Sequence, residues 1–411
     1  MRIKDIADIN QKVLSENTPK NFMFRYIDIS SVDSNGNISE SEPLYFGDAP
    51  SRARRVLRVN DIIISTVRTY LKAIAFISPN YKDYIASTGF AVLTPKKDVN
   101  PNYIYYGLIN NDFIDEVSKN SIGVSYPAIT SSELSSLSVP LPSLPVQRRI
   151  VSYLDSKTSE IDQAISLLER KREAYTRLKA SVINRAVTRG LNPNVKIKDS
   201  GVEWIGKIPE GWKVRRIKDI TSDVFMGKTP EYTLEDNENY ILGQKNNQTD
   251  GITFEGIKFG TDDFFRSRAS YEFLQYHDVL LNTLGGGSVG RVGLYDYEGP
   301  KHVITDGHLM ILRCKEYDPR ILYYFLYTKR REIEQMAIGS TNQAFFNVSD
   351  INILQVPVPP LPEQRSIASY LDAECSKIDR AASIVAKEID AYKRLKRSLI
   401  NEVVTGKRKV D

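Results

Sequence analysis

An internal duplication constrains the fold of this chain more than any other feature of its sequence. Residues 139–188 begin V-P-L-P-S-L-P-V-Q-R-R-I, and residues 356–405, which lie 217 positions later, begin V-P-V-P-P-L-P-E-Q-R-S-I. The two segments align without a gap and roughly half of their positions are identical, so one structural element occurs twice. Any fold must therefore accommodate this element in two copies.

Each copy is predicted to form one long helix. Pro145 and Pro362 close an extended lead-in, and proline is tolerated in the first turn of a helix. Beyond them apolar residues recur every seven positions, at Leu154, Ile161, Leu168, Tyr175 and Val182 and again at Leu371, Ile378, Val385, Tyr392 and Leu399. This period is typical of coiled coils, so we expect the two copies to pair antiparallel, with a pseudo-twofold axis and one globular domain near each end.

Charged residues occupy the second strip of this apolar seam. Lys157 and Lys171 in the first copy, and Glu374 and Glu388 in the second, stand where a homodimeric zipper would have aliphatic residues. If the copies pair, the lysines could face the glutamates and help to fix the register. Solvated helix faces explain the same charges equally well.

The segments that precede the helices also repeat, although more loosely. Strands are predicted at residues 61–67, 73–77, 89–93 and 278–283, and helix starts at Asn100-Pro101 and Asp318-Pro319. The fold class is therefore α+β: two mixed domains joined by two long helices in a pseudo-twofold tandem repeat. The predicted boundaries are 1–138 and 191–355 for the domains, and 139–190 and 356–411 for the lead-ins and helices.

Positive charge is concentrated in the predicted helices. The net charge is +5, and residues 145–190 hold 10 Lys and Arg against 5 Asp and Glu, while residues 1–144 hold 15 against 15. Residues 362–411 hold 11 against 8, and residues 191–361 hold 20 against 23. A basic rod suits a polyanion lying alongside it, although a mild basic bias is also common on exposed helices without a ligand.

Composition indicates a soluble cytoplasmic protein. The two cysteines, Cys314 and Cys375, form no metal-binding or disulfide pattern, which is typical of a reducing compartment. No apolar run approaches the about 18 residues that a membrane span needs, and Met1 to Asp5 do not lead into a signal-peptide core.

The lead-in motifs carry a specific resemblance. P-S-L-P-V-Q-R at 142–148 and P-P-L-P-E-Q-R at 359–365, each followed by I-x-x-Y-L-D and a helix ending L-K-x-S-x-I-N, resemble the conserved regions of type I restriction-modification specificity subunits. Residues 200–212, S-G-V-E-W-I-G-K-I-P-E-G-W, resemble the leader of that family's target-recognition domains. The first half departs from the family pattern in lacking this leader and in having Val146 where the second copy has Glu363.

The resemblance implies a function and a set of partners. Each target-recognition domain would read one half of a bipartite site in double-stranded DNA through the major groove, and the helical rod would set the gap. The rod would dock two methyltransferase subunits and, through them, restriction and translocase subunits. The chain itself would do no chemistry and bind no cofactor, since S-adenosylmethionine, and ATP with Mg²⁺, belong to the partner subunits.

Catalytic alternatives find weaker support in the residues. Asn100-Pro101-Asn102-Tyr103 approximates the base-holding loop of adenine methyltransferases, but the third residue differs and a helix cap is favoured. The glycines from Gly285 to Gly290 match a dinucleotide pattern, yet a strand is predicted after them, which favours a glycine hairpin. The histidines, His277, His302 and His308, have no metal-ligand spacing. A stand-alone adenine methyltransferase and a DNA-associated coiled-coil scaffold remain the alternatives to a specificity subunit.

Candidate DNA contacts are polar residues in predicted loops, because phosphates and base edges are bound by such side chains. In the first domain these are Arg68, Thr69, Lys72, Ser125 and Tyr126. In the second domain they are Lys245, Asn246, Asn247, Ser288, Arg291, Asn342 and Gln343. Each is also compatible with an ordinary solvated turn. The aromatic pairs Tyr105-Tyr106 and Tyr323-Tyr324, and both tryptophans, Trp204 and Trp212, are interpreted as core residues.

Overall fold

A computed structural model describes residues 1–81, 84–249, 251–297, 302–337 and 345–410. The chain divides into two compact units. Unit 1 comprises residues 1–170 and 386–411, and unit 2 comprises residues 171–385. Each unit therefore combines one globular part with one segment from each of the two duplicated regions.

The two duplicated regions each form one uninterrupted helix, as predicted. Helix α5 spans Leu144–Arg189 and helix α11 spans Leu361–Val404. Pro145 and Pro362 lie in the first turn, where the missing N–H group removes no intrahelical hydrogen bond. The lead-in prolines therefore define where each helix begins.

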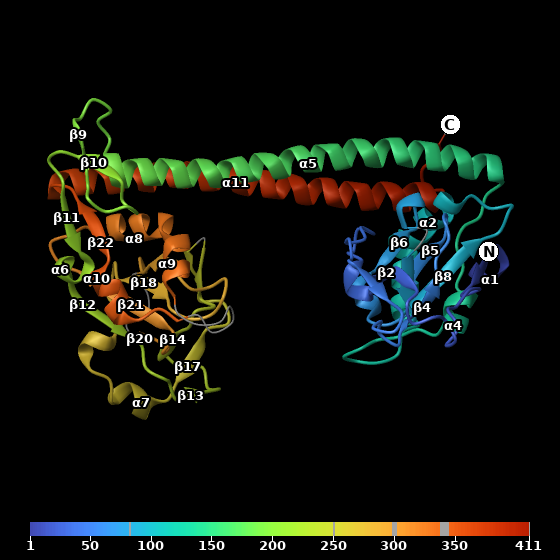
Figure 1. Ribbon diagram of the computed structural model, residues 1–411, viewed down its shortest axis with the longest axis horizontal. Helices are drawn as coiled ribbons and strands as arrows, with labels where there is room; N and C mark the ends of the chain where they lie inside the picture. The colour runs from blue at the N-terminus through green and yellow to red at the C-terminus, as the bar shows by residue number, and fades with distance from the viewer. Residues whose placement is uncertain (82–83, 250, 298–301, 338–344, 411) are drawn as a thin grey trace. The chain divides into compact units, whose positions relative to one another are not determined.

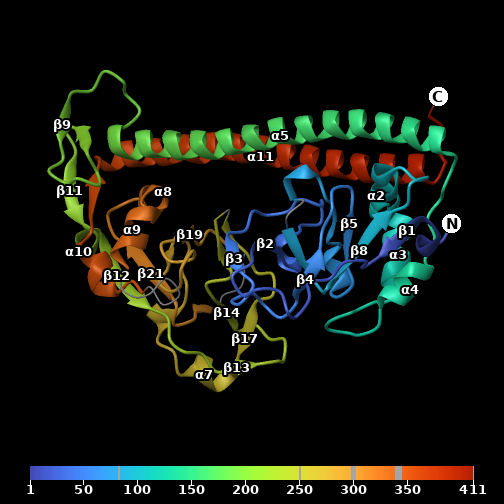
Figure 2. The same cartoon turned by 45° about the vertical axis from the view of Figure 1, so that its right-hand side comes forward.

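Within each unit the two helices run side by side in opposite directions (Figure 1, Figure 2). In unit 1 the beginning of α5, with Leu154, shares a hydrophobic core with the end of α11, with Leu399. In unit 2 the end of α5, with Ile183, shares a core with the beginning of α11, with Leu371. The predicted antiparallel pairing is confirmed in both units.

Two interhelical ion pairs show the register of the helices. Lys396 Nζ lies 2.7 Å from the Asp162 carboxylate in unit 1, and Lys179 Nζ lies 2.7 Å from the Asp379 carboxylate in unit 2. The two pairs correspond under the 217-residue repeat, because Lys179 matches Lys396 and Asp162 matches Asp379. The duplication therefore reproduces the contacts between the helices as well as their sequence.

The prediction that the heptad residues line the contact between the two helices is confirmed for the apolar positions, but the charged residues Lys157 and Glu374 are placed differently. Of the ten heptad residues only Tyr392 is exposed, at 37%. Two interpretations of Lys157 and Glu374 were open, and the one in which they face each other across the helices is wrong. Lys157 pairs with Glu160 at 2.8 Å and Glu374 with Lys377 at 2.7 Å, each one turn away on its own helix. Neighbours on the same helix were closer partners than the opposite helix.

The globular part of unit 1 contains two four-stranded sheets. The first is antiparallel, in the order β1 (Ala7–Ile9), β8 (Phe90–Pro95), β5 (Ile62–Ser65), β6 (Ile74–Phe76). The second has the order β3 (Pro43–Tyr45), β2 (Met23–Ile27), β7 (Tyr84–Ser87), β4 (Ala53–Val56), and its β2 and β7 are parallel. The helices are α1 (Ile3–Ile6), α2 (Pro101–Ile109), α3 (Asn111–Lys119) and α4 (Ser131–Ser136), with short 3-10 turns η1 (Ile29–Ser31), η2 (Thr69–Leu71) and η3 (Pro79–Tyr81).

The globular part of unit 2 repeats this plan. An antiparallel sheet has the order β12 (Thr221–Met226), β21 (Leu309–Cys314), β18 (Val279–Asn282), β19 (Val292–Leu294). A second sheet has the order β13 (Tyr232–Thr233), β17 (Lys258–Gly260), β14 (Tyr240–Leu242), β20 (Val303–Thr305), with β14 and β20 parallel. Further elements are the strand pairs β9 (Ile197–Asp199) with β10 (Lys207–Pro209), β11 (Lys213–Arg216) with β22 (Gln355–Val358) and β15 (Asn247–Gln248) with β16 (Gly251–Ile252), helices α6 (Ile217–Ile220), α7 (Asp262–Arg266), α8 (Pro319–Thr328), α9 (Arg330–Met336) and α10 (Val348–Ile353), and η4 (Ser270–Glu272).

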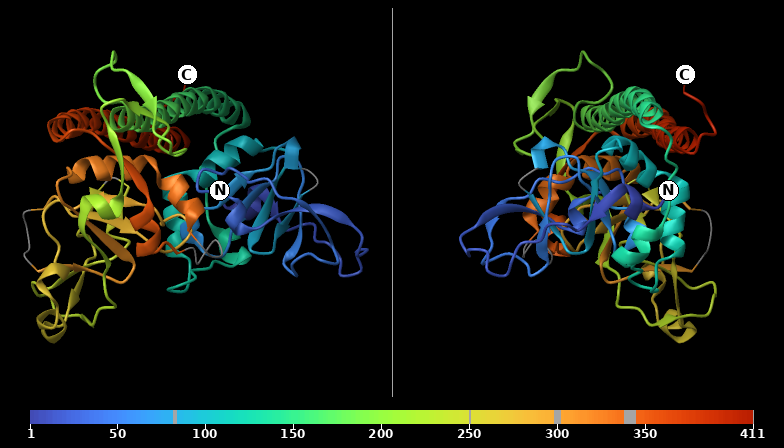
Figure 3. Two further views of the ribbon diagram at one scale, coloured as in Figure 1. Left: turned by 60° about the vertical axis from the view of Figure 1, so that its left-hand side comes forward. Right: turned by 90° about the vertical axis from the view of Figure 1, so that its right-hand side faces the viewer.

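The central strands are apolar on both faces because each lies between two cores. In β5, Ile62 and Ile64 face the core shared with α2, and Ile63 faces the core on the opposite side. The run of three isoleucines is therefore buried throughout, which explains why it does not alternate with polar residues. The predicted α+β class is confirmed, and the additional views in Figure 3 show the same layers of helix and sheet within each unit.

Candidate nucleic-acid interface

Two loops meet at the surface of the globular part of unit 1. The first, residues 66–72, follows β5, and the second, residues 121–129, precedes α4. The Ile129 N–H donates to the Thr66 carbonyl at 2.9 Å, and the Thr69 hydroxyl donates to Ser121 Oγ at 2.9 Å. The fold therefore brings the predicted residues Arg68, Thr69 and Lys72 beside Ser125 and Tyr126.

Most of these side chains are accessible. Arg68, Lys72, Ser125 and Tyr126 are exposed, and the Arg68 guanidinium lies 4.9 Å from the centre of the Tyr126 ring. Thr69 is buried and its hydroxyl joins the two loops. Thr69 therefore shapes the surface, and the other four side chains form it.

Two of the basic residues have an unfavourable backbone conformation. Arg68 and Lys72, at the two ends of η2, both have φ of 53°, in the left-handed region that disfavours residues with a Cβ atom. The position equivalent to Arg68 in unit 2 is Gly285, with φ of 88°. A left-handed backbone therefore occurs at this position in both units. Unit 2 has glycine there, which adopts it without strain, whereas unit 1 has the long basic side chain of Arg68.

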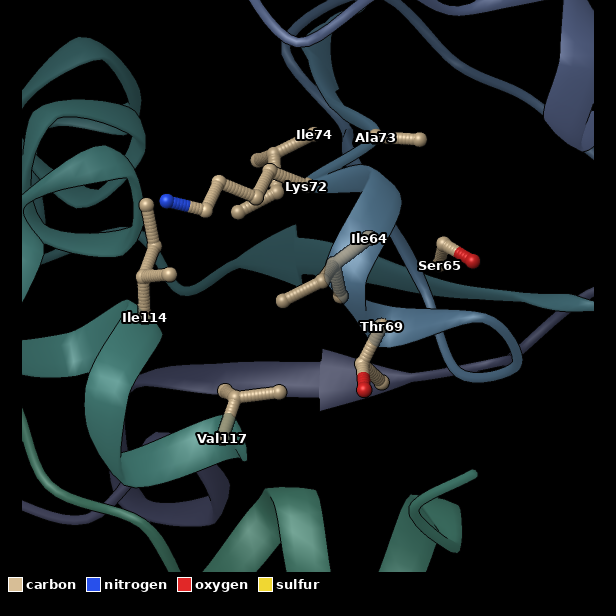
Figure 4. A pocket seen from close by; sticks show the side chains of 8 residues that line it. All are labelled: Ile64, Ser65, Thr69, Lys72, Ala73, Ile74, Ile114 and Val117. Carbon is tan, nitrogen blue, oxygen red and sulfur yellow. The ribbon is translucent and has the colours of Figure 1, made fainter. Parts of the chain in front are cut away.

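The cavity beneath this loop is too small for a ligand. It is lined by residues of β5, η2, β6 and α3 and has room for no more than one water molecule. Figure 4 shows Lys72 stretched across it toward Ile114 of α3, while Ser65 points to the other side. The candidate site is therefore an open surface, which suits a macromolecule better than a small molecule.

Unit 2 contains an equivalent backbone hydrogen bond after its central strand. The Phe346 N–H donates to the Thr283 carbonyl at 3.0 Å, which matches the bond between Ile129 and Thr66 in unit 1. Strands β18 and β19 are antiparallel neighbours, so the predicted glycine hairpin is confirmed. The predicted contacts Asn342 and Gln343 lie outside the described residues.

The polar cluster predicted in unit 2 is partly internal. Asn246 and Asn247 are each only 1% exposed. Asn246 donates to the Thr253 and Glu255 carbonyls, and Asn247 donates to Asn282 Oδ1 at 2.8 Å. These two residues therefore hold the loops together, and the prediction that they are presented to DNA does not agree with their burial. Such side chains are polar because buried backbone groups need partners.

The remaining members of that cluster lie nearer the surface. Lys245 is exposed, although its ammonium group donates to the Gly256 carbonyl at 2.6 Å. Arg291 Nη1 donates to Gln248 Oε1 at 3.0 Å, and the Ser288 hydroxyl donates to the Leu284 carbonyl at 2.5 Å. Lys245, Ser288 and Arg291 are thus less buried than Asn246 and Asn247, although each already has a partner within the domain.

A buried glutamine in each lead-in ties the globular part to its helix, and sequence reasoning assigned it no role. Gln147 accepts a hydrogen bond from the Asn100 N–H at 2.9 Å and donates to the Pro142 carbonyl at 2.8 Å. Gln364 accepts from the Asp318 N–H and donates to the Pro359 carbonyl, both at 2.8 Å. Since each glutamine is 1% exposed, it satisfies groups that water does not reach.

Tyrosines provide further links between the globular parts and the helices. The Tyr106 hydroxyl donates to Asp155 at 2.7 Å and the Tyr324 hydroxyl donates to Asp372 at 2.8 Å. Burial raises the pKa of Tyr103 to about 12, and its hydroxyl donates to the Pro140 carbonyl at 3.0 Å. Burial and the neighbouring carboxylates raise the pKa of Tyr106 and of Tyr324 above the ordinary range. The interpretation of the paired tyrosines as packing residues is confirmed.

The sequence difference between Val146 and Glu363 has a structural counterpart. Glu363 accepts a hydrogen bond from the Trp212 indole at 3.0 Å, which fastens the leader of residues 200–212 to the start of α11. Val146 instead packs against the hydrophobic core of unit 1. Trp212 is buried in the core as predicted, and Trp204, which is partly buried, packs edge-on against Phe325 at the border of that core.

In the described part of the chain the Asn100 motif has a structural role, and neither a metal-binding cluster nor a membrane-spanning helix is present. Asn100 caps α2 by accepting from the Tyr103 N–H at 3.2 Å, which confirms the helix-cap interpretation. Among the described residues no three His, Cys, Asp or Glu side chains converge in an arrangement able to hold a metal ion. No helix in the described ranges is long and apolar enough to span a membrane.

Comparisons with known proteins agree with this geometry. Residues 1–170 and 209–384 match the family model of the type I restriction modification DNA specificity domain. The MjaVIII type I restriction enzyme specificity subunit of Methanocaldococcus jannaschii is 25% identical over 340 residues, which cover 80% of this chain and 75% of that protein. The putative MjaX specificity subunit of the same organism is 24% identical, over 99% of this chain and 93% of its own length.

A solved structure supports the fold. A chain from a study of complex assembly and conformational transition of the type I R-M system superposes with a TM-score of 0.74. It is 24% identical to this chain, and the alignment covers 98% of this chain and 96% of the other. At this identity the superposition shows a similar fold, and the aligned 98% of this chain includes both globular parts and both long helices.

Proposed function

We propose, because the chain belongs to the type I restriction modification DNA specificity family, that it is a specificity subunit whose two globular domains each read one half of a bipartite DNA sequence. Residues 1–138 form domain 1 and residues 191–355 form domain 2 in this proposal. The paired helices set the gap between the half-sites.

One observation carries this proposal. In both domains the segment after the central strand is joined to a distant segment by an equivalent backbone hydrogen bond, 2.9 Å long at Thr66 and 3.0 Å long at Thr283, yet the side chains that follow Thr66 and Thr283 differ. At the position of Arg68 in domain 1, domain 2 has Gly285. A repeated platform with different side chains is what two readers of different sequences require, because base edges are distinguished by the groups that face them.

The chain acts within a larger complex in this proposal. Two methyltransferase subunits dock on the paired helices, and restriction and translocase subunits join through them. This chain provides recognition and no catalysis. S-adenosylmethionine, and ATP with Mg²⁺, are bound by the partner subunits, and DNA is the ligand of this chain.

The test exchanges one domain. The chain is co-expressed with a methyltransferase subunit of its own system, and methylated adenines are mapped by long-read sequencing. We expect a split motif with a fixed gap, and exchange of residues 1–138 for those of a relative should change one half only. The scaffold or stand-alone methyltransferase alternative would be favoured if the methylated motif stays the same after the exchange. The same conclusion would follow if methylation occurs without this chain.

Replacing Arg68 by glycine should separate binding from stability. Relief of the left-handed strain should offset the loss of packing on Tyr126, so the free energy of unfolding should change by less than about 1 kcal/mol. The complex should bind its DNA site more weakly. If Arg68 neutralises one phosphate, the slope of log affinity against log salt concentration should fall by about one.

Asn60→Gly is the matched control. Asn60 also has a left-handed backbone, with φ of 72°, and lies outside both loops. This variant should bind DNA like the unaltered protein, with the same salt slope. Equal DNA affinity for Arg68→Gly and the unaltered complex would remove Arg68 from the interface.

A further inference from the structure

Domain 1 presents an apolar tip beside its basic residues. The apolar tip is defined as Ile122, Val124 and Tyr126, on the loop that faces η2. Their exposed fractions are 76%, 101% and 65%, so Val124 is as accessible as in an extended peptide. Exposing three neighbouring apolar side chains to water to this extent costs free energy, which a partner that covers them would recover.

The tip is held in a defined shape. The Ile122 N–H donates to the Ala128 carbonyl at 2.8 Å, and the Ala128 N–H donates to the Ile122 carbonyl at 2.9 Å. Gly123 has φ of 118°, and a Cβ atom there would lie 3.0 Å from the Tyr126 carbonyl oxygen. The loop is therefore a closed turn with Val124 at its end, and such a turn loses little conformational freedom on binding.

Charge around the tip selects the partner. Residues 66–72 and 121–129 together contain two basic residues, Arg68 and Lys72, and no acidic residue. The Arg68 guanidinium stacks on Tyr126, a member of the tip. An apolar projection flanked by positive charge fits a polyanion that has an apolar group between its phosphates, and duplex DNA offers one such group on its major-groove edge, the C5-methyl of thymine.

We propose that Val124, supported by Ile122, contacts the C5-methyl group of a thymine in the half-site that domain 1 reads. The contact specifies that base pair, because cytosine, guanine and adenine present polar atoms or no methyl group at this edge. Arg68, which stacks on Tyr126, holds the tip against the DNA backbone. This inference rests on the proposed function and adds to it a specificity-determining residue and the group it recognises.

The first experiment needs no protein variant. The complex with its methyltransferase subunit is titrated against duplexes in which each thymine of the half-site is replaced in turn by deoxyuridine, which lacks the methyl group. One replacement should weaken binding about fourfold, the ratio that corresponds to burial of one methyl group. The other replacements should have little effect.

The second experiment tests whether Val124 is the partner of that methyl group. In Val124→Ser the sensitive duplex and its deoxyuridine version should bind equally, because the methyl group has lost its partner. The sequenced methylation motif should relax at that one position of the half-site. Val13→Ser is the matched control, since Val13 is 51% exposed in the same domain but outside both loops, and it should keep the fourfold difference.

The outcomes are distinguishable. Binding that is insensitive to deoxyuridine at every thymine overturns the inference and leaves the bipartite reader intact. An undiminished fourfold difference in Val124→Ser also overturns it. Loss of methyltransferase association in Val124→Ser, measured by size-exclusion chromatography, would show that the tip contacts protein instead. If the unaltered complex prefers no bipartite site, the proposed function itself fails.

Discussion

Removal of seven residues from each long helix should abolish methylation of the native DNA site and shift activity to a site with a shorter gap. Seven residues correspond to about 10 Å of helix, which matches about three base pairs of duplex. A seven-residue deletion preserves the phase of the apolar seam, so the helices can still pair. The expected result is a motif with both halves unchanged and a gap about three base pairs shorter.

The ion pairs define where to cut. Asp162 and Lys179 are 17 residues apart on α5, and Asp379 and Lys396 are 17 residues apart on α11. Deletion of 167–173 and 385–391 lies between these residues on both helices and leaves both ion pairs in place. Long-read sequencing of methylated adenines gives the new gap directly.

A single deletion is the control for the double deletion. Deletion of 167–173 alone should place the two helices out of register and eliminate methylation, which controls for helix length without matched pairing. If the double deletion methylates the original motif with the original gap, the helices do not set the spacing. Circular dichroism at 222 nm should confirm that the double deletion remains helical.

Replacing Gln364 by alanine should lower the free energy of unfolding by about 3 kcal/mol. The change leaves the Asp318 N–H and the Pro359 carbonyl buried without a partner, and each such group costs about 1–3 kcal/mol. Gln147→Ala should have a similar effect in unit 1, because its two hydrogen bonds have nearly the same lengths, 2.9 and 2.8 Å. Urea unfolding measures the loss.

Two further variants isolate the cause. Gln364→Met keeps most of the volume, so a loss close to that of alanine would assign the effect to the hydrogen bonds rather than to a cavity. Gln163→Ala, on an exposed face of α5, should change stability by less than about 0.5 kcal/mol. Amide exchange at the start of α8 should accelerate in Gln364→Ala. Unchanged exchange there would contradict the role assigned to Gln364.

The regular features of this protein could be read from its sequence. The seven-residue period predicted both long helices, and Pro145 and Pro362 predicted where they begin, because these rules depend on neighbours along the chain. Asn100 was predicted as a helix cap for the same reason. The duplication predicted that both halves have the same plan, since similar sequences bury similar faces.

Contacts between distant segments required the tertiary structure. The sequence left open whether Lys157 and Glu374 face the other helix or lie on solvated helix faces, and in the structure each has a partner one turn away on its own helix. Asn246 and Asn247 appeared to be surface residues, yet they are buried because the chain brings backbone groups to them from residues 253–255 and from Asn282. Whether a polar side chain is internal depends on such neighbours, which spacing in the sequence does not reveal.

The sequence by itself determined the duplication, the two long helices, the α+β class and the resemblance to specificity subunits, because each depends on local pattern or on motif. Only the tertiary structure decided which loops meet, that Arg68 lies over Tyr126, and that Gln147 and Gln364 join each domain to its helix. Those contacts link residues that are 46 to 63 positions apart in the chain, and their formation depends on how whole elements pack.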